Sequence, residues 1–264
     1  MIFFDTHYHH KDGLDFAAEI ASFRSDMAAN DKLCMITPGG SFAESIVAQK
    51  VANCAENIWF CSGVHPHCAA DFLTSNDDFS ALEDDSKCCA VGEIGLDYYY
   101  DFSDEESQKK VFAYFLERAL AKNLPAVVHV RDKDESLRAY EDAYIMLKDF
   151  AGQGGRFELH SYAGNTDFLE KFAGLGAYFS VNGMITFKKA DNIRLNLQKI
   201  PLDRLLIETD SPYLAPVPNR GKVNRPSWVT FVAQKAADEL QMPLEKFCEL
   251  TAENAEKFFN IEII

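Results

Sequence analysis

The sequence contains no apolar run that approaches the about 20 residues needed to cross a membrane. Met1–Phe4 is too short for a signal peptide and lacks a cationic flank, so we expect a cytoplasmic protein. The seven cysteines include no C-x-x-C pair, and an odd count outside the secretory route predicts reduced thiols. No linker, repeat array or low-complexity segment interrupts the chain. We therefore predict a single domain over residues 1–264.

Basic residues are also scarce, with 26 lysines and arginines against 41 acidic residues and a formal net charge of −15. This charge favours solubility and opposes non-specific association with polyanions. A nucleic-acid substrate would therefore need a local cationic patch or a bound metal ion. The segment 211–237 contains Arg220, Lys222, Arg225 and Lys235 but no acidic residue, so it is a candidate patch. The sequence indicates no membrane association and no obligate protein partner.

Short apolar segments alternate with stretches that have helical periodicity. At 264 residues, eight such β-then-α units match a (β/α)8 TIM barrel, the α/β fold that is typically about 250 residues long. A doubly wound open sheet is the main alternative, since alternation alone does not show closure. The predicted strands are Ile2–Thr6, Leu33–Thr37, Ile58–Gly63, Ala90–Ile94, Ala126–Val130, Phe157–His160, Ala177–Val181 and Leu205–Thr209. The predicted helices are Ser41–Ala55, Gln108–Lys122, Ser136–Phe150, Asp167–Ala173, Pro226–Leu240 and Leu244–Phe259.

All the histidines lie at or just past the ends of predicted strands. They are His7, His9, His10, His65, His67, His129 and His160. Barrels of this kind build their sites at the carboxyl ends of several strands, where side chains converge. Because imidazole and carboxylate hold divalent metals, the pattern predicts a metal centre at this end of the sheet. His10 directly follows His9 and should point away from it, so we predict that it lies outside the site.

Individual motifs suggest how such a centre is composed. His7 and His9 are two residues apart in extended backbone and project to the same side. Glu93 lies in a glycine-flanked strand, where a buried carboxylate is costly unless it is paired or binds metal; it could bridge two ions. His129 and His160 could complete a second site. Asp210 could contact the first ion and accept a proton from a metal-bound water, which serves as the nucleophile.

Other residues are candidates for substrate contacts, each with a structural alternative. His65 could orient substrate or a leaving group, or be a rim histidine bonded to backbone. Arg131 could contact a phosphate, or pair with Glu93 or Asp132. Arg220 and Lys222 suit an anionic substrate, although they could be charges of a solvated loop. Asp97 and the tyrosines 98–100 could line the mouth or stack on a base, with core packing at least as likely for two of the three tyrosines.

The motifs taken together resemble those of the TatD family of metal-dependent hydrolases, in order and over essentially the whole chain. The resemblance lies in Asp5–His9, Gly63–His67, Val91–Tyr99, Val128–Asp132, Ile200–Leu214 and Arg220–Asn224. The chain departs from the usual family pattern at Tyr8, His10, Tyr100 and the segment 161–163, none of which is a predicted ligand. These departures concern the substrate pocket.

The resemblance implies a (β/α)8 barrel of the amidohydrolase superfamily with two divalent metal ions. It implies His7, His9, Glu93 and Asp210 around one ion, and Glu93, His129 and His160 around the other. It also implies a deoxyribonuclease activity, commonly magnesium-dependent and exonucleolytic. We expect Glu93, Asp210 and His65 to act in catalysis, and His65, Arg131, Arg220 and Lys222 to contact a DNA substrate.

Two points stay open from the sequence. Many other branches of the superfamily hydrolyse small amides, lactones or esters; they bridge their metals with a carboxylated lysine, where this chain has Glu93. The glutamate favours the TatD-like branch, so a nuclease that acts on ester bonds is the first hypothesis and a small-molecule hydrolase is the alternative. A metal-dependent binding protein without catalysis is a third and weaker possibility. The ion could be magnesium, manganese or zinc, because four imidazoles favour softer metals while the family resemblance points to magnesium.

Overall fold

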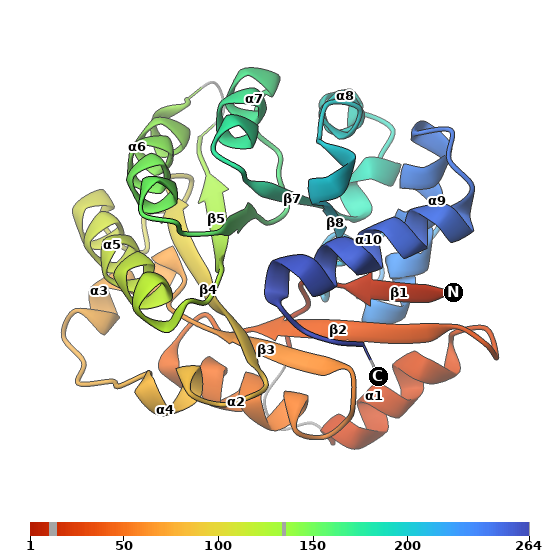
Figure 1. Cartoon of the computed structure of the whole chain (residues 1–264), viewed down its shortest axis with the longest axis horizontal. Helices are drawn as coiled ribbons and strands as arrows, with labels where there is room; N and C mark the ends of the chain where they lie inside the picture. Colours follow the sequence, from red (N-terminus) through yellow and green to blue (C-terminus); the bar gives the residue numbers. More distant parts are fainter. Residues whose placement is uncertain (11–14, 134–135, 264) are drawn as a thin grey trace.

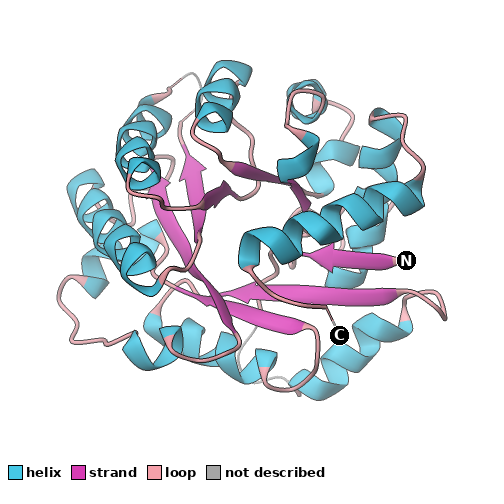
Figure 2. Cartoon of the chain, in the orientation of Figure 1, coloured by secondary structure: helices cyan, strands magenta, loops and turns pink. Residues whose placement is uncertain are grey.

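The structure, a computed structural model, describes residues 1–10, 15–133 and 136–263. Eight parallel strands are hydrogen-bonded to their neighbours in sequence order. Figures 1 and 2 show the strands at the centre of the molecule with the helices around them. The Thr6 N–H donates to the Ile207 carbonyl at 3.1 Å and joins the last strand to the first. The sheet is thus a nearly closed barrel. The strands are β1 (Ile2–Asp5), β2 (Lys32–Pro38), β3 (Ile58–Ser62), β4 (Cys88–Asp97), β5 (Ala126–Arg131), β6 (Phe157–Leu159), β7 (Tyr178–Val181) and β8 (Leu205–Ile207).

Helices surround the barrel and connect successive strands (Figure 1). The longer ones are α1 (Phe16–Ser25), α2 (Phe42–Ala52), α5 (Glu105–Lys122), α6 (Arg138–Gly152), α7 (Thr166–Gly174), α9 (Val229–Glu239) and α10 (Leu244–Phe259). The shorter ones are α3 (Ala69–Phe72), α4 (Ser80–Glu83), α8 (Asp191–Leu197) and the 3-10 turns η1 (Pro66–Cys68), η2 (Gly183–Thr186), η3 (Leu202–Arg204) and η4 (Pro226–Trp228).

Polar side chains fix where several helices begin. Asp15, Ser41, Asp104 and Asn165 each accept a hydrogen bond from the backbone N–H three residues later, at the start of α1, α2, α5 and α7. Such caps satisfy an N–H that has no partner within the helix and contribute about 1 kcal/mol each. The caps therefore explain the position of these boundaries.

Two apolar layers hold the barrel together. The larger lies between the strands and the helices and includes residues such as Phe115 of α5 and Phe172 of α7. The smaller fills the interior with alternate strand residues, among them Phe4, Trp59 and Leu206. Phe258 and Phe259 of α10 belong to this inner layer, which ties the last helix to the barrel. The interior below the site is therefore a packed core.

The predicted barrel is confirmed, and the open sheet is wrong, because β8 and β1 are joined. All eight predicted strands overlap observed ones, but β4 and β5 extend further than predicted. Glu93 and His129 consequently lie further from the carboxyl ends of their strands than predicted. Helices α1 and α8 and the short helices α3 and α4 lie outside the predicted helical stretches. No helix in the described ranges is both long and apolar enough to cross a membrane, and all seven cysteines are free thiols.

Candidate metal centre

The residues predicted to bind metal converge at the carboxyl end of the barrel. His7 and His9 follow β1, His160 follows β6 and Asp210 follows β8, while Glu93 and His129 lie in β4 and β5. His65, which follows β3, joins them. Their side chains come from six strand regions that the barrel topology brings together.

Glu93 lies at the middle of this cluster, and its two carboxylate oxygens face different histidines. Oε2 lies 3.3 Å from His7 Nε2 and 3.8 Å from His9 Nε2. Oε1 lies 2.8 Å from His160 Nε2, 3.0 Å from His129 Nδ1 and 3.6 Å from His65 Nε2. We call His7, His9 and Asp210, which lies beyond His9, the Oε2 group, and His65, His129 and His160 the Oε1 group. The rings of His7 and His160 stack where the two groups meet.

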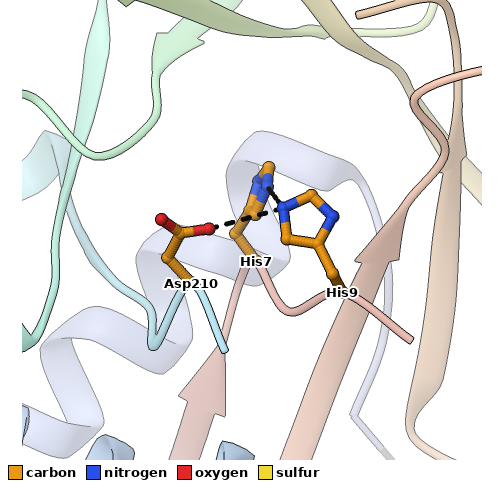
Figure 3. Close-up of side chains that lie close together, drawn as sticks. All are labelled: His7, His9 and Asp210. Atoms are coloured by element: carbon orange, nitrogen blue, oxygen red, sulfur yellow. Dashed lines mark hydrogen bonds and ion pairs between the residues drawn. The ribbon is translucent and has the colours of Figure 1, made fainter. Parts of the chain in front are cut away.

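The Oε2 group is built where the first and last strands meet. His7 Nε2 and His9 Nε2 are 3.3 Å apart, and His9 Nε2 lies 3.4 Å from Asp210 Oδ1 (Figure 3). The Asp210 N–H donates to the His7 carbonyl at 2.9 Å, which fixes the two segments against each other. Asp210 has a left-handed backbone (φ 52°), a conformation that aspartate tolerates better than most residues.

The Oε1 group is backed by two buried carboxylates. His129 Nδ1 and His160 Nε2 are 3.3 Å apart. On its far side, His129 Nε2 lies 3.1 Å from Asp97 Oδ2, and His160 Nδ1 lies 3.5 Å from Glu208 Oε1. Carboxylates behind histidine ligands orient the ring and increase its basicity. The same arrangement here would direct His129 Nδ1 and His160 Nε2 toward Glu93.

Two glycines allow β4 and β5 to approach closely enough to form this group. Gly95 is paired with His129, and a Cβ on Gly95 would lie 2.0 Å from the His129 carbonyl oxygen. A Cβ on Gly92 would lie 2.6 Å from the Cβ of Val127. Glycines on both sides of Glu93 are therefore required by the strand packing that places His129 beside it.

The charges around Glu93 are balanced by the histidines. Burial raises the pKa of Glu93, but the facing histidines, His160 foremost, hold it well below its usual value. For His160, burial lowers the pKa, yet Glu93 and Glu208 together raise it well above its usual value. Burial lowers the pKa of His7 and of His65. The carboxylate thus stays ionised in a buried position, as a metal ligand must.

The donor set fits divalent metal ions. An ion about 2 Å from each donor leaves neighbouring donors about 3 Å apart, which is the spacing around both oxygens of Glu93. In three triads the ligand atoms all lie within 4.8 Å of one another: His7–His9–Asp210, His7–Glu93–His160 and His65–Glu93–His129. Imidazole with carboxylate is a donor mixture that suits zinc, manganese or iron.

His65 lies closer to this cluster than its predicted role implies. It was expected to orient substrate, whereas its Nε2 belongs to a triad of possible ligands with Glu93 and His129. Its Nδ1 accepts a hydrogen bond from the His67 N–H, so the other ring nitrogen faces Glu93. Both the substrate role and a ligand role are compatible with this position.

The other predicted substrate residues lie outside the cluster. Arg131 extends its guanidinium over Tyr99 and Tyr100, and in the described part of the chain it pairs with neither Glu93 nor Asp132. Arg220 stacks on Phe187 at 3.6 Å from the ring centroid, and Lys222 donates to Asn219 at 3.0 Å. Across residues 1–10, 15–133 and 136–263, no contact joins Arg220 or Lys222 to the metal-binding candidates.

The remaining sequence predictions differ in outcome. His10 lies away from the cluster, with its Nε2 2.9 Å from Glu19. Of the three tyrosines, Tyr98 is buried while Tyr99 and Tyr100 are exposed, so core packing holds for one rather than two.

Sequence reasoning missed the residues behind the histidines. Asp97 was expected at the mouth, yet it is buried and accepts from both His67 and His129. Glu208 was not singled out, although it is fully buried and accepts hydrogen bonds from Ser180 and Asn182. The available signal for Glu208 was a carboxylate that directly follows the apolar run Leu205–Ile207, two residues before Asp210.

Comparison with known proteins identifies the class to which this barrel and its histidine cluster belong. The metal-dependent hydrolase YcfH of Escherichia coli K12 is 34% identical to this chain. The match covers 99% of this chain and 97% of YcfH. The crystal structure of the E. coli TatD homologue YJJV superposes with a TM-score of 0.83 at 25% identity, covering 98% of each chain. The chain is a metal-dependent hydrolase built on a TIM barrel.

The family follows from two further matches. The family model described as "TatD related DNase" matches residues 4–260. The 3'-5' ssDNA/RNA exonuclease TatD of Escherichia fergusonii is 29% identical over 77% of this chain and 78% of its own length. This protein belongs to the TatD family.

Proposed function

We propose that this protein is a divalent-metal-dependent phosphodiesterase that removes nucleotides from an end of a nucleic-acid strand, with DNA as the expected substrate. The observation that carries the proposal is the division of donors around Glu93, whose two oxygens face separate groups. Two ions held at neighbouring positions suit in-line displacement at phosphorus. The similarity to a relative described as an ssDNA/RNA exonuclease supports the same choice.

The residues of the Oε2 group would hold one ion and His129 and His160 of the Oε1 group the other, with Glu93 shared. When bound, such ions supply Lewis acidity and lower the pKa of water toward neutrality. Asp210 is our candidate for the proton acceptor, because its carboxylate is 15% exposed and lies 3.4 Å from His9 Nε2. A carboxylate in that position is accessible to water and is held at a defined place.

Residues at the rim would bind the substrate. Arg220 and Lys222 lie in the loop that follows Asp210, and the stacking of Arg220 on Phe187 holds its guanidinium in place. Guanidinium binds phosphate through a planar pair of donors, so this loop is suited to a strand entering from the β8 side. His65 would orient the scissile group from the opposite side.

The direct test is cleavage of end-labelled single-stranded DNA by metal-stripped protein, with magnesium, manganese or zinc added back. We expect stepwise shortening that requires a metal ion and is lost in Asp210→Ala. The matched control is Asp203→Ala, an exposed carboxylate at the amino end of the same strand. This control should cleave like the wild type.

The same experiment distinguishes the nuclease from the alternative, a small-molecule hydrolase. If protein that binds metal cleaves neither DNA nor RNA with any of the three ions, the nuclease proposal is wrong. Hydrolysis of small esters, lactones or amides by the same preparation would then establish a small-molecule hydrolase. Cleavage that is retained in Asp210→Ala would remove Asp210 from the reaction while leaving the nuclease assignment intact.

A further inference from the structure

Three large aromatic side chains are exposed just past β4. Tyr99 is 39% exposed, Tyr100 is 40% exposed and Phe102 is 67% exposed. The ring of Tyr100 lies 4.8 Å from that of Tyr99 and 5.5 Å from that of Phe102. We call these three residues the aromatic platform. A group of apolar rings left exposed beside a polar site is typical of a binding surface.

The platform is continuous with the candidate metal centre. His65, whose Nε2 lies 3.6 Å from Glu93, has its ring centroid 4.3 Å from that of His67. The ring of His67 in turn lies 4.8 Å from Phe102 and 5.4 Å from Tyr100. His67 is held in this position because its Nε2 lies 2.9 Å from Asp97. The platform thus begins two ring contacts from His65, which itself lies beside Glu93.

The charges around the platform indicate where a phosphate can lie. The guanidinium of Arg131 lies 4.1 Å from the ring centroid of Tyr99 and 5.0 Å from that of Tyr100. A cavity of about 330 Å³ next to Tyr100 has a mainly acidic lining, in which Asp101, Asp104 and Glu105 outnumber the one cation, Lys133. These carboxylates repel phosphate, whereas Arg131 attracts it. A strand on the platform would therefore pass its backbone along Arg131.

The net charge of the protein makes stacking important for affinity. At −15, the chain as a whole repels a nucleic acid, so release of counterions from the strand contributes little to binding. Stacking of bases on aromatic side chains does not depend on charge and is tolerant of sequence. It can only occur with unpaired bases, because bases in a duplex are stacked on both faces.

From these observations we propose that Tyr100 and Phe102 form a stacking subsite for an unpaired base next to the metal centre, with Arg131 on the adjoining phosphate. This inference rests on the proposed function, since it assigns the substrate position beside the same centre. It makes the two aromatic residues determinants of the preference for unpaired strands.

The test is binding of two short single-stranded probes to metal-stripped protein in the presence of a chelator, so that no cleavage occurs. One probe is a thymidine oligomer with a single 2-aminopurine, and the other is the same backbone with abasic sites. We expect the wild type to bind the base-containing probe about tenfold or more tightly, and to quench the 2-aminopurine fluorescence. The double variant Tyr100→Ala/Phe102→Ala should bind both probes alike and cause no quenching.

Two further variants separate stacking from a general structural effect. Tyr100→Phe/Phe102→Trp keeps both aromatic rings and should retain the preference and the quenching. Phe231→Ala removes an exposed phenylalanine of α9, away from the platform, and should behave like the wild type. Thermal unfolding of each variant would show that the fold is retained.

The outcomes distinguish this inference from the function on which it rests. Equal affinity of the wild type for the two probes, or base-dependent quenching that survives in the double alanine variant, overturns the subsite. Binding of a duplex as tightly as the single strand, unaffected by the double alanine variant, also overturns it. A base preference that depends on Tyr100 and Phe102, in a protein that cleaves no nucleic acid with any ion, would support the subsite while refuting the nuclease.

Discussion

The two donor groups on either side of Glu93 differ in what lies behind them. The Oε1 group consists of three imidazoles, and the buried carboxylates of Asp97 and Glu208 support two of these. The Oε2 group contains a carboxylate of its own, Asp210, and is more open, with the His9 side chain 29% exposed. The first arrangement fixes ligands, while the second leaves an acceptor that water can reach. We infer that the Oε1 group is the structural half of the centre and the Oε2 group the half where the proton is transferred.

Glu93→Ala should give the largest effect, because it removes the one residue that both groups share. We expect turnover to be abolished while the fold is retained, with metal binding weakened at both positions. Turnover measured under strict metal control, together with calorimetric titration of the ion, checks this. Wild-type turnover by the variant would rule out a shared bridge.

Asp97→Asn tests whether the supporting carboxylates matter for one group more than the other. We expect about 10- to 100-fold weaker binding of one ion, the range seen when carboxylates behind ligands are changed. The second ion should bind nearly as before. Titration of metal-stripped protein gives both affinities, with Asp101→Asn, an exposed carboxylate nearby, as the control. Equal weakening of both ions would contradict the division into two groups.

Arg220→Ala tests the rim on the side of the Oε2 group. We expect KM for a single-stranded oligonucleotide to rise by about tenfold with little change in kcat, the result of losing one charge-assisted contact of about 1.4 kcal/mol. Lys222→Ala should have a smaller effect, because an ammonium binds phosphate as a point charge. Lys199→Ala, an exposed lysine paired with Glu170, serves as the control. An unchanged KM in Arg220→Ala would make this loop a solvated segment without a role in binding.

Glu158→Gln should produce the smallest effect, and on stability rather than turnover. Glu158 precedes His160 by two residues, is fully buried, and neither carboxylate oxygen has a hydrogen-bond partner among the described residues. Burial raises its pKa well above the usual value. A raised pKa in the folded state contributes stability below the unfolded-state pKa, and this contribution is lost as pH rises.

The glutamine variant should therefore gain stability relative to the wild type as pH rises from about 5 to about 8. Urea unfolding across this range measures the difference, with the exposed Glu249→Gln as the control. A constant difference in the free energy of unfolding would show that Glu158 has the same protonation state throughout. In that case Glu158 would be ionised beside His160, whereas we infer that it is protonated at the lower end of this pH range.

The sequence was informative about the fold because strands buried on both faces form continuous apolar runs. Their ends were less certain: β4 continues to Asp97 because the pairing of Gly95 with His129 extends the ladder. The residues expected to bind metal were identified because imidazoles and carboxylates followed those runs. Their roles remain predictions, although the structure places them together.

Other features depend on side-chain directions that no pattern specifies. Asp97 accepts hydrogen bonds from two histidines that belong to different strand regions, and this depends on the register between β4 and β5. The stacking of Arg220 on Phe187 joins two loops that are far apart in the sequence. Contacts of this kind are visible only once the barrel is assembled.

The junction between β1 and β8 has a consequence for the order in which the protein becomes active during synthesis. The Thr209 N–H donates to Asp5 Oδ1 across 204 positions of the chain, and His7 and Asp210 meet at the same junction. The histidines of the Oε1 group, by contrast, have all been translated by residue 160. Most of the barrel is thus synthesised before Asp210, our candidate for the proton acceptor, can reach its place. Pairings between such distant segments form late, so we expect a truncated or unfinished chain to assemble the Oε1 group without hydrolytic activity.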